Sequence, residues 1–219
     1  MTSILIMARA PRGGEVKTRL EPLLGPEGCA RLQAELIRHT AAWAFDAASR
    51  AWLAFTPSHA SAEIAALVPG RVRLFAQTSG DLGARLQHAA DRIFGEHPGS
   101  LVVVGTDAPL LGVEQFEAAS RALADGHDAC LVPALDGGYT LIALARPTPT
   151  AFAIDPAAWG GPDVHQLTLE ALQGAGLDAA VLAPVTDLDT AADALALLAD
   201  PCCPPGVRAA LKPDPAVAA

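Results

Sequence analysis

Short apolar runs alternate along the chain with longer stretches in which apolar residues recur at helical spacing. The runs are rich in Val, Ile and Leu and have the length of strands. They occupy residues 4–8, 51–56, 72–76, 101–105, 129–133, 139–145 and 179–183. Between them, Leu32, Leu36 and Ile37 follow Pro26 at the spacing of one helix face, and proline is tolerated in the first turn of a helix. The pattern predicts strands with helices between most of them.

Most of these runs are continuously apolar instead of alternating between apolar and polar positions. Continuous runs are expected where helices cover both faces of a sheet. We therefore predict an α/β protein, a three-layer α/β/α sandwich with a mostly parallel, Rossmann-like sheet. One connection differs, because only Asp136, Gly137 and Gly138 and their neighbours separate two of the runs. Asp-Gly is typical of an antiparallel hairpin, so we expect a mixed sheet.

The length of the chain favours one domain. It has 219 residues, no internal repeat and no low-complexity tract that would mark a second domain. Residues 1–200 are expected to form the domain. Residues 201–219 contain five prolines and little apolar periodicity beyond 207–211, and we expect them to form a Pro-rich C-terminal tail.

The charge balance limits the partners that the chain can have. Fifteen Lys and Arg residues stand against 24 Asp and Glu, a formal net charge of -9, which argues against a broad nucleic-acid surface. Four scattered cysteines fit neither a disulfide framework nor a zinc site. No apolar run has the length of a membrane span. We expect a cytoplasmic protein without nucleic-acid or membrane partners.

Positive charge is concentrated in one loop, directly after the first predicted strand. Residues 8–20 contain three arginines, Lys17 and two glycines. Ligands of open α/β sheets bind beyond the carboxyl ends of the strands, glycine lets a backbone approach a phosphate, and Lys and Arg supply opposite charge. The loop is therefore a candidate polyphosphate site; the alternative is a solvated surface loop with one snorkelling lysine, whose ammonium lies in water. It is not a P-loop, because Val16 stands where glycine is needed, and no G-x-G-x-x-G follows the strand.

Carboxylates follow two other predicted strands. Asp107 comes after the run at 101–105, where carboxylates together with nucleotide phosphates can hold Mg²⁺; the alternative is a cap for a helix that begins near Gly112. Asp187 and Asp189 project to one side of an extended backbone. One of them is a candidate second metal ligand, and capping of a helix that begins at Thr190 is the alternative.

Two more observations bear on the chemistry. Gly80 and Asp81 open a predicted helix, whose N-terminal amides could face a nucleotide or an acceptor; ordinary capping by Ser79 or Asp81 is the alternative. The six histidines show no metal spacing, and no Gly-x-Ser-x-Gly elbow is present, which argues against a hydrolase triad.

Taken together, these segments resemble the GT-A-fold nucleotide-diphospho-sugar transferase superfamily. Within it, the chain resembles a bacterial uncharacterised glycosyltransferase group of the selenium- or arsenosugar-associated type (DUF2064-like), from about residue 4 to residue 198. The motifs that carry the resemblance are Ala8-x-Ala10-Pro11-Arg12 through Val16-Lys17-Thr18-Arg19-Leu20, Gly80-Asp81-Leu82-Gly83-x-Arg85-Leu86, Gly105-Thr106-Asp107-x-Pro109, Asp136-Gly137-Gly138-Tyr139-x-Leu141-Ile142, Trp159-Gly160 and Asp187-x-Asp189-Thr190.

The resemblance implies a set of site residues. It implies Lys17 and Asp107 as catalytic residues and a Mg²⁺ or Mn²⁺ ion bound by Asp107 and Asp189. The residues that it implies for binding the nucleotide and its phosphates are Ala8, Arg9, Arg12, Gly14, Lys17, Arg19, Gly80 and Asp81. Those that it implies for an acceptor pocket are Asp136, Gly137, Tyr139 and Trp159.

Two chemistries fit this resemblance. A glycosyltransferase moves a sugar from a nucleoside-diphosphate sugar to a small-molecule acceptor, and the nucleoside diphosphate leaves; this is our leading prediction. A nucleotidyltransferase moves NMP from an NTP to a phosphorylated small molecule, and pyrophosphate leaves. The first loop, with Lys17-Thr18-Arg19-Leu20, is also similar to that of phospholactate guanylyltransferases. A non-catalytic nucleotide-binding module is the third hypothesis. We expect a monomer or a homodimer.

Overall fold

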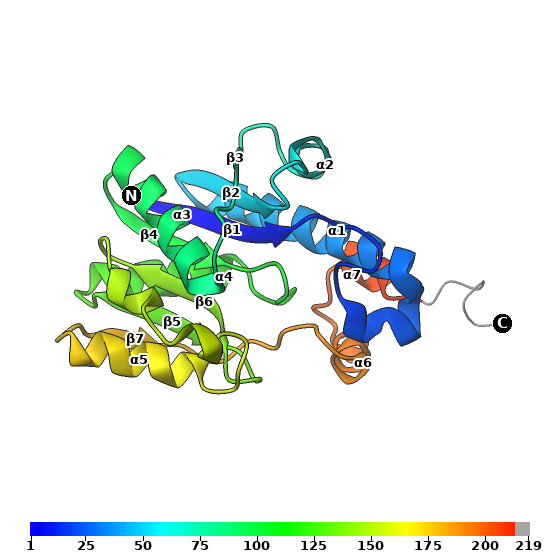
Figure 1. Ribbon diagram of the computed structural model, residues 1–219. Coiled ribbons are helices and arrows are strands. Elements are labelled where there is room, and N and C mark those ends of the chain that lie inside the picture. The colour runs from blue at the N-terminus through cyan, green and yellow to red at the C-terminus, as the bar shows by residue number, and fades with distance from the viewer. Residues whose placement is uncertain (213–219) are drawn as a thin grey trace.

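A mixed sheet forms the centre of the computed structural model, which describes residues 1–212 (Figure 1). Its strands are β1 (Thr2–Arg9), β2 (Arg50–Thr56), β3 (Arg73–Ala76), β4 (Ser100–Val104), β5 (Ala129–Pro133), β6 (Tyr139–Leu144) and β7 (Ala179–Val181). They lie in the order β3-β2-β1-β4-β6-β5-β7. Each strand overlaps one of the apolar runs read from the sequence, so the predicted α/β class is confirmed.

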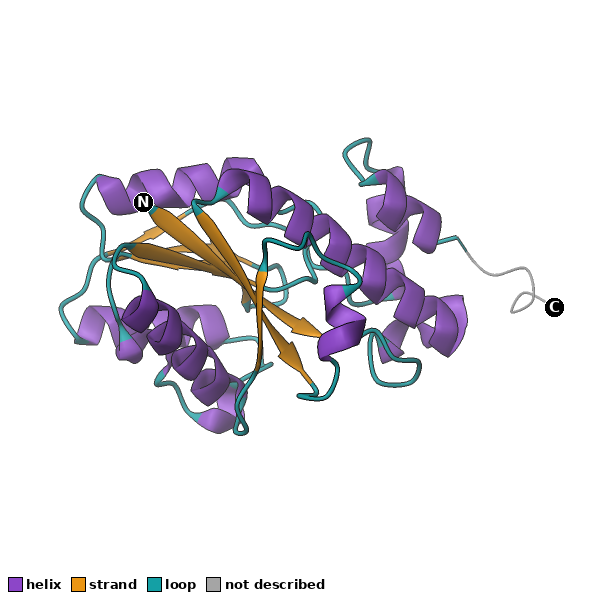
Figure 2. Ribbon diagram, turned by 90° about the horizontal axis from the view of Figure 1, so that it is seen from above, coloured by secondary structure: helices purple, strands orange, loops and turns teal. Residues whose placement is uncertain are grey.

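Helices cover both faces of the sheet (Figure 2). They are η1 (Thr18–Leu20), α1 (Glu21–Ala47), α2 (Ser61–Ala65), α3 (Leu82–Glu96), α4 (Val113–Ala124), η2 (Pro149–Phe152), η3 (Pro156–Ala158), α5 (Val164–Gly174), α6 (Ala191–Ala199) and α7 (Pro205–Ala210). On one face Ile4 packs in a core with Ile37 of α1 and Phe116 of α4. On the other, Leu5 packs with Leu86 of α3 and Leu172 of α5. Successive residues of β1 thus face opposite cores, which is why the strand is apolar throughout.

Strand β6 runs against its neighbours. It pairs antiparallel with both β4 and β5, whereas the other neighbouring strands pair parallel. The turn between β5 and β6 is the hairpin predicted from Asp136-Gly137-Gly138, and Gly137 has φ 95, a conformation that favours glycine. Because the hairpin turns back at the carboxyl end of β5, it lies at the same sheet edge as the loops after β1, β4 and β7.

Helix α1 is broken close to its start. Gly25 has φ 66 and ψ 167, which is not helical, and Pro26 follows inside the helix. The long straight part therefore begins with proline in its first turn, as the sequence predicts. This part of α1 carries Cys29 and Gln33, both buried, on the side that faces the loop after β1.

The segment after residue 200 differs from the expected tail. Helix α7 packs against α1, and Cys203, Val207 and Leu211 are buried in one core with residues of α1 and α6. The expectation of a tail is wrong for residues 201–211, because Pro204 and Pro205 begin a helix at positions where proline is tolerated. Residues 213–219 of the predicted tail lie outside the described residues. In the described part of the chain, no helix combines the length and the apolar character that crossing a membrane would require.

Candidate functional site

Lys17 lies between two aspartates that come from different loops. Its Nζ is 2.5 Å from Oδ1 of Asp107 and 3.0 Å from Oδ1 of Asp189, and it also donates a hydrogen bond to the Leu188 carbonyl oxygen, 2.7 Å away. The Lys17 side chain is only 5% exposed, whereas those of Asp107 and Asp189 are 55% and 40% exposed. The Lys17 side chain therefore points inward, and the alternative of a snorkelling lysine with its ammonium in water is wrong.

The local backbone of Lys17 is unusual. Its φ of 49 makes it the one positive-φ residue other than glycine among the described residues, and such a conformation costs about 1 kcal/mol or more. The Lys17 carbonyl accepts hydrogen bonds from the backbone N–H of Leu20 and from Cys29 Sγ, at 2.8 and 3.2 Å. Burial alone would lower the pKa of Lys17, but the charges of Asp107 and Asp189 outweigh it and raise the pKa above its usual value.

Asp107 lies in the loop after β4 and follows Gly105 and Thr106. It does not cap α4, because the N-cap of that helix is Gly112, whose N–H donates to Gln115 Oε1 at 3.0 Å. The capping alternative for Asp107 is therefore wrong. Its backbone carbonyl accepts a 2.8 Å hydrogen bond from the Leu188 N–H, which ties the loop after β4 to the segment that carries Asp189.

A group of three carboxylates lies beside this ion pair. One oxygen each of Asp136, Asp187 and Asp189 lie within 4.8 Å of one another, from the hairpin turn and the segment after β7. Burial, the nearby charge of Asp136 and the further charges of Asp189 and Asp193 raise the pKa of Asp187 to about 6. Because hard divalent cations prefer oxygen ligands, the donor set fits Mg²⁺ or Mn²⁺.

Neither Asp187 nor Asp189 caps the helix that follows them. The cap of α6 is Thr190, whose hydroxyl accepts from the Asp193 N–H, while Asp193 Oδ2 accepts from the Thr190 N–H at 2.7 Å. Asp193 Oδ2 also accepts from the Asp189 N–H at 3.1 Å. The capping box holds the backbone of this segment and leaves the two carboxylates directed at the sheet edge.

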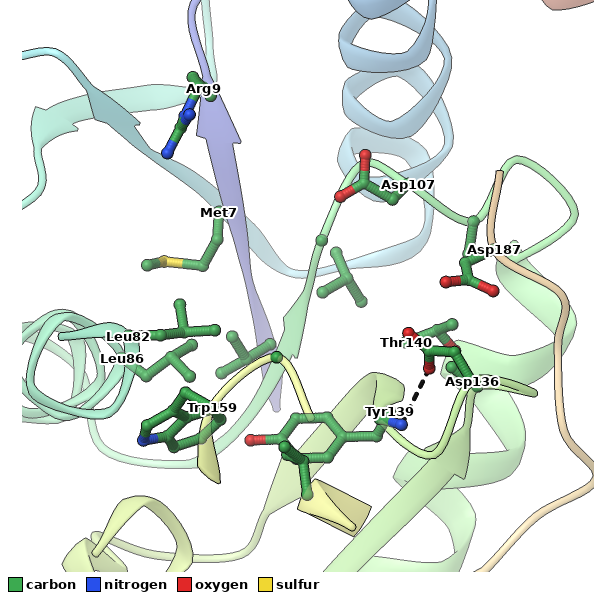
Figure 3. A pocket seen from close by; sticks show the side chains of 18 of the residues that line it. Met7, Arg9, Leu82, Leu86, Asp107, Asp136, Tyr139, Thr140, Trp159 and Asp187 are labelled. Carbon is green, nitrogen blue, oxygen red and sulfur yellow. Dashed lines mark hydrogen bonds between the residues drawn. The ribbon is translucent and has the colours of Figure 1, made fainter. Parts of the chain in front are cut away.

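A cavity of about 390 Å³ opens at the same edge (Figure 3). In Figure 3, Asp107, Asp136 and Asp187 lie on one side, and the rings of Tyr139 and Trp159 lie on the other with Leu82 and Leu86. Burial raises the pKa of Tyr139 far above its usual value, so its hydroxyl stays protonated near neutral pH. The cavity therefore offers an acidic end and an apolar, aromatic end.

The aromatic end depends on a glycine of α3. A Cβ at Gly83 would lie 2.7 Å from Trp159 Nε1 and 2.7 Å from the Phe152 carbonyl oxygen. Glycine at this position lets Trp159 pack directly against the start of α3. This explains one glycine of the motif Gly80-Asp81-Leu82-Gly83 in packing terms.

A second cavity, of about 360 Å³, lies on the side of the loop after β1. Arg9, Lys17 and Arg19 contribute its positive charge, and Thr18 and Gln33 also line it. Met7, Arg9, Asp107 and Asp189 line both cavities. The two cavities thus share the two carboxylates that hold the lysine.

Not every residue predicted for the site lies there. Arg12 forms an ion pair with Glu63 at 2.6 Å and contacts His59 Nε2 at 2.8 Å, and it lines neither cavity. Asp81 caps α3, accepting from the Ala84 N–H at 2.9 Å, so the capping alternative describes it. The remaining predicted residues outside both cavities are Gly14, Gly80 and Gly137.

Two polar residues that line the first cavity, Gln77 and Arg85, were not predicted as site residues from the sequence. Gln77 Nε2 donates to the carbonyl oxygens of Ala8 and Ala54, at 3.2 and 2.9 Å, which joins the ends of β1 and β2. Arg85 Nη1 donates to Gln77 Oε1 at 3.2 Å. Arg85 belongs to a motif of the resemblance, but Gln77 stands alone in a polar loop and gives no pattern that would have identified it.

Comparisons with known proteins agree with this architecture. The sequence pattern of the family described as "Uncharacterized protein conserved in bacteria (DUF2064)" matches residues 40–161. No curated protein matches the sequence. A solved structure from Desulfovibrio desulfuricans G20, described as a candidate nucleotide-diphospho-sugar transferase, is 28% identical, with a TM-score of 0.86 over 96% of this chain and 93% of that one.

More distant structures share the fold. The CMP:2-keto-3-deoxy-manno-octonic acid synthetase complexed with CTP is 13% identical, with a TM-score of 0.56 over 87% of this chain and 94% of that chain. The 4-diphosphocytidyl-2C-methyl-D-erythritol synthase from Anaerococcus prevotii DSM 20548 is 11% identical, with a TM-score of 0.55 over 88% and 94%. At these identities the likeness concerns the architecture alone.

Proposed function

This chain belongs to the family described as "Uncharacterized protein conserved in bacteria (DUF2064)", and from that premise we propose that it is a metal-dependent transferase that uses a nucleotide-activated sugar. One observation carries the proposal: Lys17, Asp107 and Asp189 meet at the carboxyl edge of the sheet. The 28% identical candidate nucleotide-diphospho-sugar transferase supports the choice of donor.

The proposed ion site rests on the carboxylates at this edge. Asp107 and Asp189 would hold Mg²⁺ or Mn²⁺, and Asp187 and Asp136, each with an oxygen within 4.8 Å of one of Asp189, would add oxygen donors. A bound divalent ion would neutralise charge on the donor phosphates and on the leaving diphosphate. Burial and the neighbouring carboxylates raise the pKa of Asp187, and carboxylates that repel one another favour binding of a cation.

The residues of the chain would then act by position and charge. Lys17 and Arg9 place positive charge beside the donor phosphates, and Lys17 is held by fixed oxygen partners, so little reorganisation is needed when charge develops. The walls formed by Tyr139 and Trp159 would take the acceptor and keep water from the reacting carbon. No covalent intermediate on the protein is needed.

The decisive experiment identifies the leaving group. The protein is incubated with Mg²⁺ or Mn²⁺, a panel of nucleoside-diphosphate sugars and NTPs, and a panel of small-molecule acceptors, and phosphorus products are identified by ³¹P NMR. We expect release of a nucleoside diphosphate that depends on the acceptor. Asp107→Asn is the control for background hydrolysis. Thermal stabilisation by nucleotide without turnover of any donor would favour the non-catalytic binding module.

Nucleotidyl transfer is a second candidate, and the second cavity favours it. Beyond the two carboxylates, Arg9, Lys17 and Arg19 line a space of about 360 Å³, where a leaving pyrophosphate would find positive charge. The same panel separates the two reactions. Pyrophosphate in place of a nucleoside diphosphate would replace the glycosyl assignment by the nucleotidyl one.

A further inference from the structure

A buried amide joins the two loops that carry Lys17 and Asp107. Gln33, on α1, is 3% exposed. Its Nε2 donates to the Arg9 carbonyl oxygen at 3.3 Å and to Thr106 Oγ1 at 3.1 Å. Arg9 ends β1, and Thr106 precedes Asp107 in the loop after β4, so one side chain contacts both loops at their roots.

Thr106 is itself enclosed. It is 3% exposed, whereas Asp107 next to it has an exposed side chain. Leaving a buried hydroxyl without its hydrogen-bond partner destabilises the folded protein. The hydrogen bond between Thr106 and Gln33 therefore restricts movement of the loop after β4. Because the peptide bond between the two residues is planar, holding Thr106 in place also limits where the backbone of Asp107 can lie.

The same face of α1 also holds Lys17. Cys29 lies one helical turn before Gln33, and residues four apart share a helix face. Cys29 Sγ contacts the Lys17 carbonyl oxygen at 3.2 Å, where the backbone is left-handed. Two residues on successive turns of one helix therefore contact the lysine loop and the aspartate loop.

We infer that Gln33 is a positioning residue of the site: through Thr106 and the Arg9 carbonyl it fixes Asp107 opposite Lys17. This inference rests on the proposed function only for its effect on turnover. Its effect on Lys17 is measurable without any substrate. Nothing in the motifs of the sequence identifies Gln33, because its role depends on contacts between distant segments.

The variants separate positioning from simple packing. Gln33→Met keeps the approximate volume but removes the amide, and Thr106→Val removes the hydroxyl at nearly constant shape. Thr106→Ser keeps the hydroxyl and is the conservative variant. Thr40→Val is the matched control, because Thr40 lies on the same helix, is also 3% exposed and lines neither cavity.

The first readout uses the two lysines of the chain, Lys17 and Lys212. Lysine labelled with ¹³C at Cε gives one NMR signal for each, and Lys212 is exposed, so its signal marks a solvated ammonium. We expect the Lys17 signal to move toward that of Lys212 in Gln33→Met and Thr106→Val. It should stay at the wild-type position in Thr106→Ser and Thr40→Val.

The second readout is turnover for each folded molecule. Misplacement of a charged group by a fraction of an ångström to an ångström costs about ten- to a hundredfold. We expect that loss in kcat for Gln33→Met and Thr106→Val, with a much smaller change in KM. The double variant should lose little more than either single variant, because both break one contact.

The two possible failures are distinguishable. If Gln33→Met and Thr106→Val fold and keep the wild-type Lys17 signal, the positioning role is wrong, whatever the enzyme does. If the signal moves as expected but the wild-type protein turns over no nucleotide donor, the positioning role stands and the proposed function is wrong. If Gln33→Met does not fold, Thr106→Val decides the question with the same two readouts.

Discussion

The Lys17 ammonium and the Asp107 carboxylate form an ion pair of 2.5 Å, although one residue follows β1 and the other follows β4. The two strands are parallel neighbours in the sheet, so their carboxyl ends lie side by side. The nearly buried lysine therefore brings positive charge to an edge where four carboxylates lie. This pairing is the basis of the first prediction.

Lys17→Met should lower turnover by about a hundredfold, the scale of losing one electrostatic stabiliser. The methionine keeps the length of the side chain but removes the charge held between Asp107 and Asp189. The rate is measured with the donor that the panel identifies, and the thermal midpoint reports folding. Lys212→Met, at the other lysine, is the control and should keep the wild-type rate. A folded Lys17→Met protein with wild-type turnover would falsify the role of the ammonium.

Asp189→Asn should weaken binding of Mg²⁺ or Mn²⁺ by at least about tenfold, as measured by calorimetry on the protein alone. Asp189 forms an ion pair with Lys17, as Asp107 does, and it also belongs to the group of carboxylates with Asp136 and Asp187. Asp46→Asn, at an exposed position near the end of α1, is the control. Equal affinity for the ion in wild type and Asp189→Asn would show that Asp189 is not one of its ligands. Asp107→Asn and Asp187→Asn, measured in parallel, rank the remaining ligands.

Asp187→Asn should stabilise the metal-free protein above pH 6. The pKa of Asp187 is raised to about 6 by burial and by Asp136, so the folded state binds its proton more tightly than the unfolded state does. The free energy of unfolding of the wild type therefore falls as pH rises from about 4 to 6. We expect a gain of about 1–2 kcal/mol for the variant at pH 8. Denaturant unfolding should show no gain at pH 3.5; a gain that is the same at both pH values would contradict the raised pKa.

Gly137→Ala should destabilise the hairpin turn more than its backbone conformation alone explains. A Cβ on Gly137 would lie 1.7 Å from the Pro162 carbonyl oxygen, so the turn must move in addition to adopting a strained φ. Gly176→Ala is the matched control, because Gly176 also has a positive φ, 73, but no atom within 4 Å of its Cβ position. We expect a loss of about 1–2 kcal/mol for the control and about 3 kcal/mol or more for Gly137→Ala. Equal losses in thermal unfolding would show that the turn is free to relax.

Regular local patterns made the strands, the hairpin and the loop positions predictable from sequence. The apolar runs of the inner strands reflect burial on both faces, and the rule that ligands meet the carboxyl ends of strands placed Lys17, Asp107 and Asp189 at one edge. The position of Arg12 was not predictable, because its partner Glu63 belongs to a distant helix. Likewise, the proline content after residue 200 predicted a tail where the structure has the short helix α7, which is buried against α1 and α6. Contacts between distant segments leave no periodic signal in the chain.

The reversed strand β6 has a consequence for how this protein can change. Asp136 and Tyr139 reach the cavity from a tight turn and the first residue of β6, whereas Lys17 and Asp107 come from loops that lead from the parallel strands β1 and β4 into helices. A turn of this kind can be exchanged or lengthened without rethreading the chain through the sheet. Under the proposed function, a change in this turn would therefore alter the acceptor side of the cavity and leave the positions of Lys17 and Asp107 unchanged.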